Sequence, residues 1–213
     1  MRIPNAVHEA RPWRIREITP DFELEDVWAL PVHGEAADFP ALVEVMFTLE
    51  PANGPSLPTR VLWRARDRLG TLFGLDGISG PNDRASIGRQ LPIPGTHETS
   101  LVDRLPRDLR HTVADLDVDV APFAPVYQTD VEFAAELSNR TVHAAIHLAW
   151  VEVDEHGDGR YHGQMAVYVK PRGAFGQAYM AFIKPFRYGI VYPAVMRQIE
   201  HAWNTRMAHV GVA

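Results

Sequence analysis

The chain has 213 residues, of which 46% are apolar and 23% are charged, and its formal net charge is −6 with a pI near 5.9. This length and composition are typical of one soluble domain with a sizeable core, and the acidic charge argues against a general nucleic-acid binder. The absence of cysteine excludes disulfides, thiolate nucleophiles and cysteine-ligated metal centres.

The N-terminal residues M-R-I-P-N-A-V-H-E-A lack the apolar core of a signal peptide, and no run in the sequence approaches the ~20 apolar residues that span a bilayer. We therefore expect a cytoplasmic protein with no membrane partner. The chain has 19 arginines against two lysines, which is typical of bacterial genomes rich in G and C. We expect a single domain over residues 1–213, in which residues 1–10 are a candidate for disorder.

The first third of the chain predicts one strand followed by two helices. Alternation of Trp13 and Ile15 with arginines predicts a strand over 11–18. A helix is predicted over 37–50, where Asp38 is placed to cap and five apolar residues recur at helical spacing: Phe39, Leu42, Val43, Met46 and Leu49. A second helix is predicted over 59–73.

The middle of the chain predicts loops, a broken helix and strands. The glycines in 74–96 do not form a G-x-G-x-x-G fingerprint, so we expect no dinucleotide site there. No other cofactor is expected. Residues 98–110 predict a short helix that breaks at Pro106. Beyond it, an exposed acidic strand face is favoured over a metal site for Asp115, Asp117 and Asp119. Residues 123–129 predict a strand, whereas 131–138 fits either a strand or two helical turns.

The clearest pattern is the run S-N-R-T-V-H-A-A-I-H-L-A-W-V at 138–151, in which side chains alternate with a period of two. A turn sequence, D-E-H-G-D-G, follows, and a second alternating run extends from Tyr161 to Lys170. Two such runs about a glycine-rich turn predict a long β-hairpin.

His143 and His147 are four residues apart in this run. On a helix this spacing places side chains about 6 Å apart, which would allow both rings to bind one metal ion. On a strand, which rises ~3.3 Å per residue, the separation is roughly 13 Å. Because the period favours a strand, we expect no metal shared by these histidines.

Folding the predicted hairpin collects hydrogen-bonding side chains on one face: Thr141, His143, His147, Gln164, Tyr168 and Lys170. Two interpretations stay open. The face is exposed to solvent, as in many one-sided antiparallel sheets, and this is the favoured interpretation. Alternatively, it lines a semi-polar pocket in which His143, His147 and Tyr168 are candidate catalytic residues and Thr141 and Gln164 are candidate ligand-binding residues.

Residues 174–207 change to a period of 3.6, interrupted by Pro185 and Pro193, which predicts a short helix over 175–184 and a longer one from about 185. The aromatic stripe on these helices is expected to be core, and the alternative is the wall of an apolar cavity. The candidate ligand-binding residues of that alternative are Tyr179, Phe182 and Phe186, with Lys184 and Arg187 at the mouth.

The predicted fold is an α+β arrangement: a curved antiparallel sheet, a long C-terminal helix laid across it and two N-terminal helices. This arrangement resembles the helix-grip fold of the START and Bet v 1-like superfamily. Five stretches resemble the uncharacterised bacterial family DUF2867: H-E-A-R-P-W-R-I at 8–15, D-F-E-L-E-D-V-W-A-L-P at 21–31, L-S-N-R-T-V-H-A-A-I-H-L-A-W at 137–150, G-Q-M-A-V-Y-V-K-P at 163–171, and A-Y-M-A-F-I-K-P-F-R-Y-G-I-V-Y-P-A-V-M-R at 178–197. The resemblance supports the fold and implies no catalytic residues.

Three functions follow as hypotheses. The leading one is the binding of a small hydrophobic or amphipathic molecule in a cavity between the sheet and the C-terminal helix. The second is an enzyme of the cyclase, dehydratase or hydrolase kind, with His143 or His147 as general base and Tyr168 as acid. The third is a non-catalytic partner of a short-chain reductase, because the resemblance implies a link to short-chain dehydrogenase-like proteins. No sequence signal sets an oligomeric state.

Overall fold

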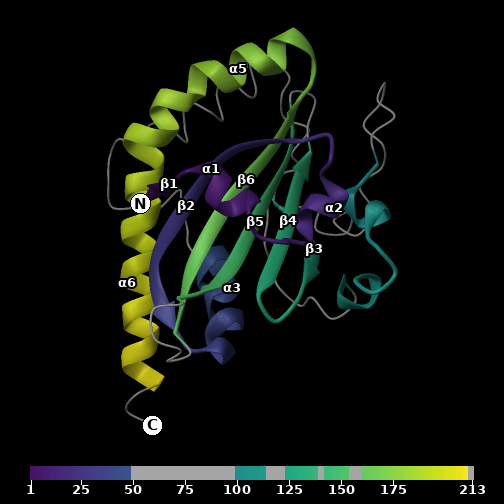
Figure 1. The fold of residues 1–213 in the computed structure, drawn as a ribbon. Coiled ribbons are helices and arrows are strands. Elements are labelled where there is room, and N and C mark those ends of the chain that lie inside the picture. The colour runs from purple at the N-terminus through teal and green to yellow at the C-terminus, as the bar shows by residue number, and fades with distance from the viewer. Residues whose placement is uncertain (49–98, 114–122, 139–141, 154–159, 211–213) are drawn as a thin grey trace, which may run out of the picture.

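The computed structural model describes residues 1–48, 99–113, 123–138, 142–153 and 160–210. Their centre is a curved antiparallel sheet of six strands in the order β1-β2-β6-β5-β4-β3 (Figure 1). The strands are β1 (Arg2–Ile3), β2 (Glu23–Gly34), β3 (Ala124–Gln128), β4 (Glu132–Ser138), β5 (Val142–Glu152) and β6 (Tyr161–Pro171). The chain is therefore an α+β protein, as the sequence predicts.

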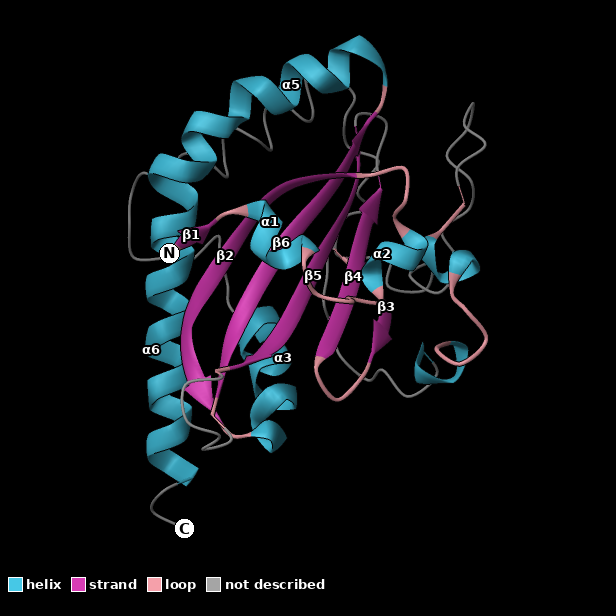
Figure 2. Ribbon diagram, in the orientation of Figure 1, coloured by secondary structure: helices cyan, strands magenta, loops and turns pink. Residues whose placement is uncertain are grey.

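Helices cover both faces of the sheet (Figure 2). The α-helices are α1 (Asn5–Glu9), α2 (Ile15–Ile18), α3 (Phe39–Thr48), α5 (Gly173–Phe186) and α6 (Tyr192–Val210). The 3-10 turns are η1 (Ala36–Asp38), η3 (Leu101–Arg104) and η4 (Arg110–Val113), and a π-helical turn, η5 (Arg187–Val191), joins α5 to α6. Short helices α1 and α2 lie on one face, α3 lies behind the other with α6 beside β2, and α5 arches over one end of the sheet.

The predicted hairpin is confirmed. Strands β5 and β6 pair in an unbroken antiparallel register that places His143 opposite Lys170, His147 opposite Ala166 and Trp150 opposite Gly163. The two histidines therefore lie on an extended strand and not on a helix. Strand β4, for which strand and helix were both open, pairs with the other edge of β5.

Both faces of this hairpin are buried, because helices and turns cover each of them. On one face Leu148 and Trp150 pack with residues of α3 and α6, including Leu42 and Trp203. On the other face the histidine-bearing side of β5 lies under α1, α2 and η3, and His147 is 0% exposed. The favoured expectation that the polar face meets solvent is wrong.

Gly163 lies where β6 passes close to its neighbours. A Cβ at this position would be 2.5 Å from Val32 Cγ2 and 3.2 Å from Leu30 Cβ. We expect Gly163→Val to lower the free energy of unfolding by about 1–3 kcal/mol, because overpacking forces strand β2 to shift. Urea denaturation measures the loss. Gly189→Ala is the control, since a Cβ at Gly189 has no atom within 4 Å, and equal stability of the two variants would contradict the prediction.

The N-terminal segment differs from its prediction. Residues 11–18 form no strand; they contain α2, and Trp13, Ile15 and Ile18 are all buried in one apolar cluster. Strict alternation would place Ile18 on the opposite side from Trp13 and Ile15, so a bend that buries all three removes more apolar surface from water. Residues 1–10, the candidate for disorder, contain β1 and α1.

Other predicted elements agree in part. Helix α3 matches the predicted helix over 37–50, and the Glu35 amide donates to Asp38 Oδ2 at 2.8 Å in a capping box at the start of η1. The break at Pro106 is confirmed, although the flanking turns η3 and η4 are 3-10 and not α-helical. The predicted helix over 59–73, the loop over 74–96, the acidic residues of 115–119 and Thr141 lie outside the described residues.

The C-terminal segment forms two helices, as predicted, but their junction is not at Pro185. That residue lies inside α5, and the junction is the π-helical turn before Pro193. Because Pro193 has no N–H and its ring disfavours a regular preceding turn, the wider π turn accommodates it in the first turn of α6.

Candidate functional site

A buried polar network lies beneath α1, on the sheet face that carries the histidines. His8, which is 0% exposed, contacts two side chains of β6. Its Nδ1 is 2.5 Å from Gln164 Oε1, and its Nε2 is 3.0 Å from the Tyr168 hydroxyl. Because an amide oxygen only accepts, His8 Nδ1 carries the proton and Nε2 accepts from Tyr168.

Burial sets the protonation of this group. Desolvation, helped by the neighbouring His147, lowers the pKa of His8 to about 4, so its imidazole is neutral near pH 7. Burial also raises the pKa of Tyr168 above its ordinary value, and the Arg16 guanidinium is the largest opposing influence. Near neutrality the network therefore consists of an uncharged imidazole and an uncharged phenol.

Next to it, Glu132 of β4 accepts hydrogen bonds from three sides. His147 Nε2 lies 3.0 Å from Glu132 Oε2, the Tyr127 hydroxyl donates to the same oxygen at 2.9 Å, and the Arg14 amide donates to it at 2.9 Å. Burial alone would raise the pKa of Glu132, but these hydrogen bonds hold it below its ordinary value. Glu132 is thus an anion that ties strands β3, β4 and β5 to the segment before α2.

A parallel pair lies further along the same strands. His143 Nε2 is 2.8 Å from Glu136 Oε2, to which the Leu101 amide also donates at 2.9 Å, and the Ser100 hydroxyl donates to Glu136 Oε1. Each histidine thus binds a different glutamate. In the described part of the chain, no group of three or more His, Asp or Glu residues is arranged to hold a metal ion.

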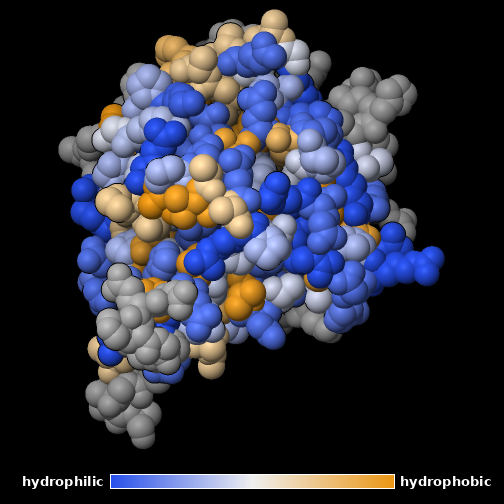
Figure 3. Space-filling model, viewed as in Figure 1, coloured by the Kyte–Doolittle hydropathy of each residue, from blue (hydrophilic) through white to orange (hydrophobic). Residues whose placement is uncertain are grey.

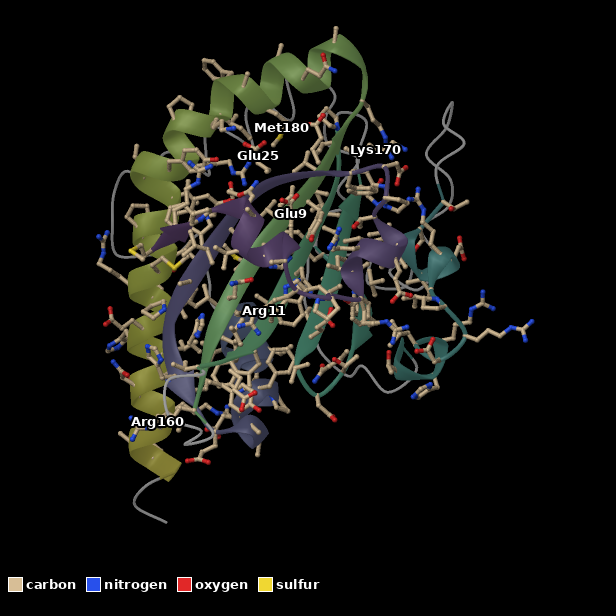
Figure 4. The ribbon with its side chains drawn as sticks, viewed as in Figure 1. Glu9, Arg11, Glu25, Arg160, Lys170 and Met180 are labelled. Carbon is tan, nitrogen blue, oxygen red and sulfur yellow. The ribbon has the colours of Figure 1, made fainter. Side chains whose placement is uncertain are left out.

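Above the network lies an open depression of about 550 Å³ between residues 9–22 and strands β2 and β6, which we call the Tyr168 depression. It is lined by Glu9, Pro12, Trp13, Arg16, Glu17, Thr19, Pro20, Phe22, Leu24 and Tyr168. Figure 3 views this side of the molecule, where apolar residues are set among hydrophilic ones, and Figure 4 labels Glu9 on α1 in front of the sheet. The depression therefore combines apolar and charged residues with Tyr168, whose hydroxyl belongs to the buried network.

The candidate residues of the hairpin are brought together only in part. Gln164 and Tyr168 meet at His8, whose ring centroid is 5.3 Å from that of His147. His143 belongs to the separate pair with Glu136.

Two of the candidates on α5 and η5, Lys184 and Arg187, lie elsewhere and contact carboxylates of β2. Arg187 Nη2 lies 3.0 Å from Asp26 Oδ2, and the Tyr192 hydroxyl donates to Asp26 Oδ1 at 3.0 Å. Lys184 Nζ is 3.0 Å from Glu25 Oε1, beneath α5 (Figure 4). Both cations therefore already have carboxylate partners. Phe182 is 65% exposed, and the side chains of Tyr179 and Phe186 lie outside the described residues.

The interface between α6 and the sheet is a packed core. Ile199 and Trp203 are 0% and 3% exposed and pack with Trp28 and Trp150. The Trp203 indole donates to the His33 carbonyl at 3.2 Å. The expectation that the stripe is core is therefore confirmed at Ile199 and Trp203, and the described side chains fill the place of the cavity in the leading functional hypothesis.

Sequence reasoning missed His8, Glu132 and Glu136. His8 lies in a short helix with no periodic pattern and is 156 residues from Gln164. The glutamates did leave a signal, because they are four residues apart in an alternating segment, just as His143 and His147 are. Antiparallel pairing of two such segments brings each glutamate diagonally beside one histidine.

The fold and the site define an α+β protein with a buried polar network below an open depression. Within the described residues, no helix is both long and apolar enough to cross a membrane. The chain belongs to the DUF2867 family: the family model, described as a protein of unknown function, matches residues 18–194. The match includes Glu132, His147, Gln164 and Tyr168. Neither a curated protein nor a solved structure matches the chain.

Proposed function

We propose that the protein binds a small amphipathic molecule in the Tyr168 depression. The observation that carries the proposal is the combination of a hollow of about 550 Å³ with apolar walls and a polar floor. Sites for small molecules are typically concave, of 300–1,000 Å³, and mostly apolar, with a few convergent polar groups. Trp13, Phe22 and Leu24 provide apolar wall, and Tyr168 provides the polar group beneath it.

The floor is rigid, which favours specific binding. The Tyr168 hydroxyl donates to His8, whose other nitrogen donates to Gln164. Its proton is therefore engaged within the protein, and these hydrogen bonds hold the phenol ring in one orientation. A preorganised surface loses little conformational entropy when a ligand binds.

Binding is favoured over acid–base catalysis by the same network. General acid–base catalysis is most efficient when the pKa of the group lies near the working pH. The pKa of His8, lowered by burial to about 4, makes it a weak base, and the raised pKa of Tyr168 makes it a weak acid. An enzyme that uses Tyr168 as its general acid is therefore the less favoured alternative.

We further propose that the domain is a variant of the helix-grip arrangement. A curved antiparallel sheet followed by a long C-terminal helix supports this assignment. In this variant the ligand lies on the sheet face opposite α6, since tryptophan side chains occupy the space below that helix.

Isothermal titration with octan-1-ol, octanoate and octylamine tests the proposed binding. We expect at least one of these amphiphiles to bind the wild-type chain, and Leu24→Trp to weaken that binding about tenfold by filling the apolar wall. Leu137→Trp is the matched control, because Leu137 is another partly buried leucine on the same sheet and does not line the depression.

Circular dichroism establishes that both tryptophan variants are folded before the titrations are compared. Absence of binding by all three amphiphiles would contradict the proposal. Equal loss of affinity in Leu24→Trp and Leu137→Trp would contradict the location.

A further inference from the structure

Arg16 is a cation without a carboxylate partner at the edge of the Tyr168 depression. Its Nη1 donates to the Glu9 carbonyl at 2.7 Å, and among the described residues it makes no ion pair. Nearby arginines differ: Arg14 pairs with Glu17 at 2.6 Å, and Arg104 pairs with Asp21 at 2.6 Å. The Arg16 guanidinium is therefore held at the depression by one hydrogen bond, and its other N–H groups can donate to a ligand.

Trp13, another residue that lines the depression, carries a second donor without an acceptor. The side chain is 8% exposed, and its Nε1 is buried with no hydrogen-bond partner among the described residues. A buried N–H without an acceptor costs about 1–3 kcal/mol, which a ligand oxygen would recover on binding. The indole ring is held against His8, with ring centroids 5.8 Å apart, so this donor has a fixed position.

A ligand that satisfies these donors must carry several acceptor atoms. The acidic side chains at the depression also limit how much negative charge that ligand can carry. Arg14 pairs with both Glu17 and Asp108, whereas Glu9 adds a negative charge beside Arg16. A dianionic head group such as a phosphate would be repelled by Glu9 more strongly than a monoanion. A carboxylate has two acceptor oxygens, one charge and a geometry that suits a guanidinium.

We propose that the ligand of the Tyr168 depression is an amphipathic carboxylate, whose head group is bound by Arg16 and Trp13 and whose apolar body lies along Phe22 and Leu24. This inference rests on the proposed function and specifies its ligand class. Arg16 and Trp13 are then the residues that determine specificity for the anionic head.

The test compares octanoate with octan-1-ol by isothermal titration, using wild type, Arg16→Gln, Trp13→Phe and Arg197→Gln. We expect octanoate to bind wild type about tenfold more tightly than octan-1-ol. Arg16→Gln is expected to weaken octanoate binding about tenfold and to leave octan-1-ol binding unchanged. Trp13→Phe keeps the ring and removes the N–H, and it is expected to weaken octanoate about threefold. Arg197 is an exposed arginine of α6, and Arg197→Gln is expected to change the affinity for neither octanoate nor octan-1-ol.

The outcomes separate the two proposals. If octan-1-ol binds as tightly as octanoate and Arg16→Gln changes neither, the carboxylate assignment is wrong while amphiphile binding stands. Preferential binding of octylamine would overturn the assignment in the same way. If no amphiphile binds wild type, both proposals fail.

Discussion

Replacing Glu132 with leucine is expected to lower the free energy of unfolding by about 3–5 kcal/mol. The substitution removes the acceptor shared by the His147 ring, the Tyr127 hydroxyl and the Arg14 amide. Two buried donors and one partly buried amide are then left without this acceptor. Removing one member of a buried charged group typically costs this much. Urea denaturation with a common m-value measures the change.

Two further variants make the Glu132 result specific. Glu132→Gln retains one acceptor oxygen and is expected to lose less stability than the leucine variant. Glu200→Leu, at an exposed position of α6, is expected to stay within about 0.5 kcal/mol of wild type. A Glu132→Leu variant as stable as Glu200→Leu would show that the hydrogen bonds of Glu132 do not stabilise the fold.

The second large effect is a dependence of stability on pH that originates at His8. Its pKa is about 4 in the folded chain against an ordinary value of 6.5. Between these values the unfolded chain binds a proton that the folded chain does not, so lowering the pH favours unfolding. We expect the free energy of unfolding to fall by about 2–3 kcal/mol between pH 8 and pH 4.5 from this group.

The comparison with His8→Gln isolates this contribution. The glutamine variant is expected to be less stable at pH 8 but to show a shallower loss on acidification, because its position no longer titrates. His201→Gln, at an exposed site of α6, is expected to keep the wild-type slope. Identical slopes for wild type and His8→Gln would contradict a neutral, buried His8.

Much of the fold was predictable because local periodicity and burial agree in its regular elements. The alternation in 142–151 and 161–170 predicts the hairpin, and the 3.6-residue spacing predicts α3 and α6. The segment 11–18 failed because a short run with two alternating apolar residues also suits a bend that buries Trp13, Ile15 and Ile18 together. At this length tertiary packing outweighs the pattern.

The site was less predictable, because its residues meet through contacts that are distant in sequence. The sequence indicated which hairpin residues share a face, and Gln164 and Tyr168 do meet there. It did not indicate that α1 would cover that face, since alternation alone does not distinguish a solvated polar face from one whose polar groups pair with one another. His8 and Glu132 make the difference, and neither was a candidate.

The central claim, that the ligand site is above Tyr168 and not beneath α6, is tested most directly by tryptophan indole signals in 1H–15N NMR spectra. The titrant is octanoate or octan-1-ol, whichever binds more tightly. Trp13 lines the depression, whereas Trp150 and Trp203 lie in the core on the opposite face. We predict that the Trp13 indole cross-peak shifts as titrant is added and reaches a plateau when the site is saturated. The cross-peaks of Trp150 and Trp203 are predicted to stay in place. A shift confined to Trp203 or Trp150, with Trp13 unmoved, would contradict the account.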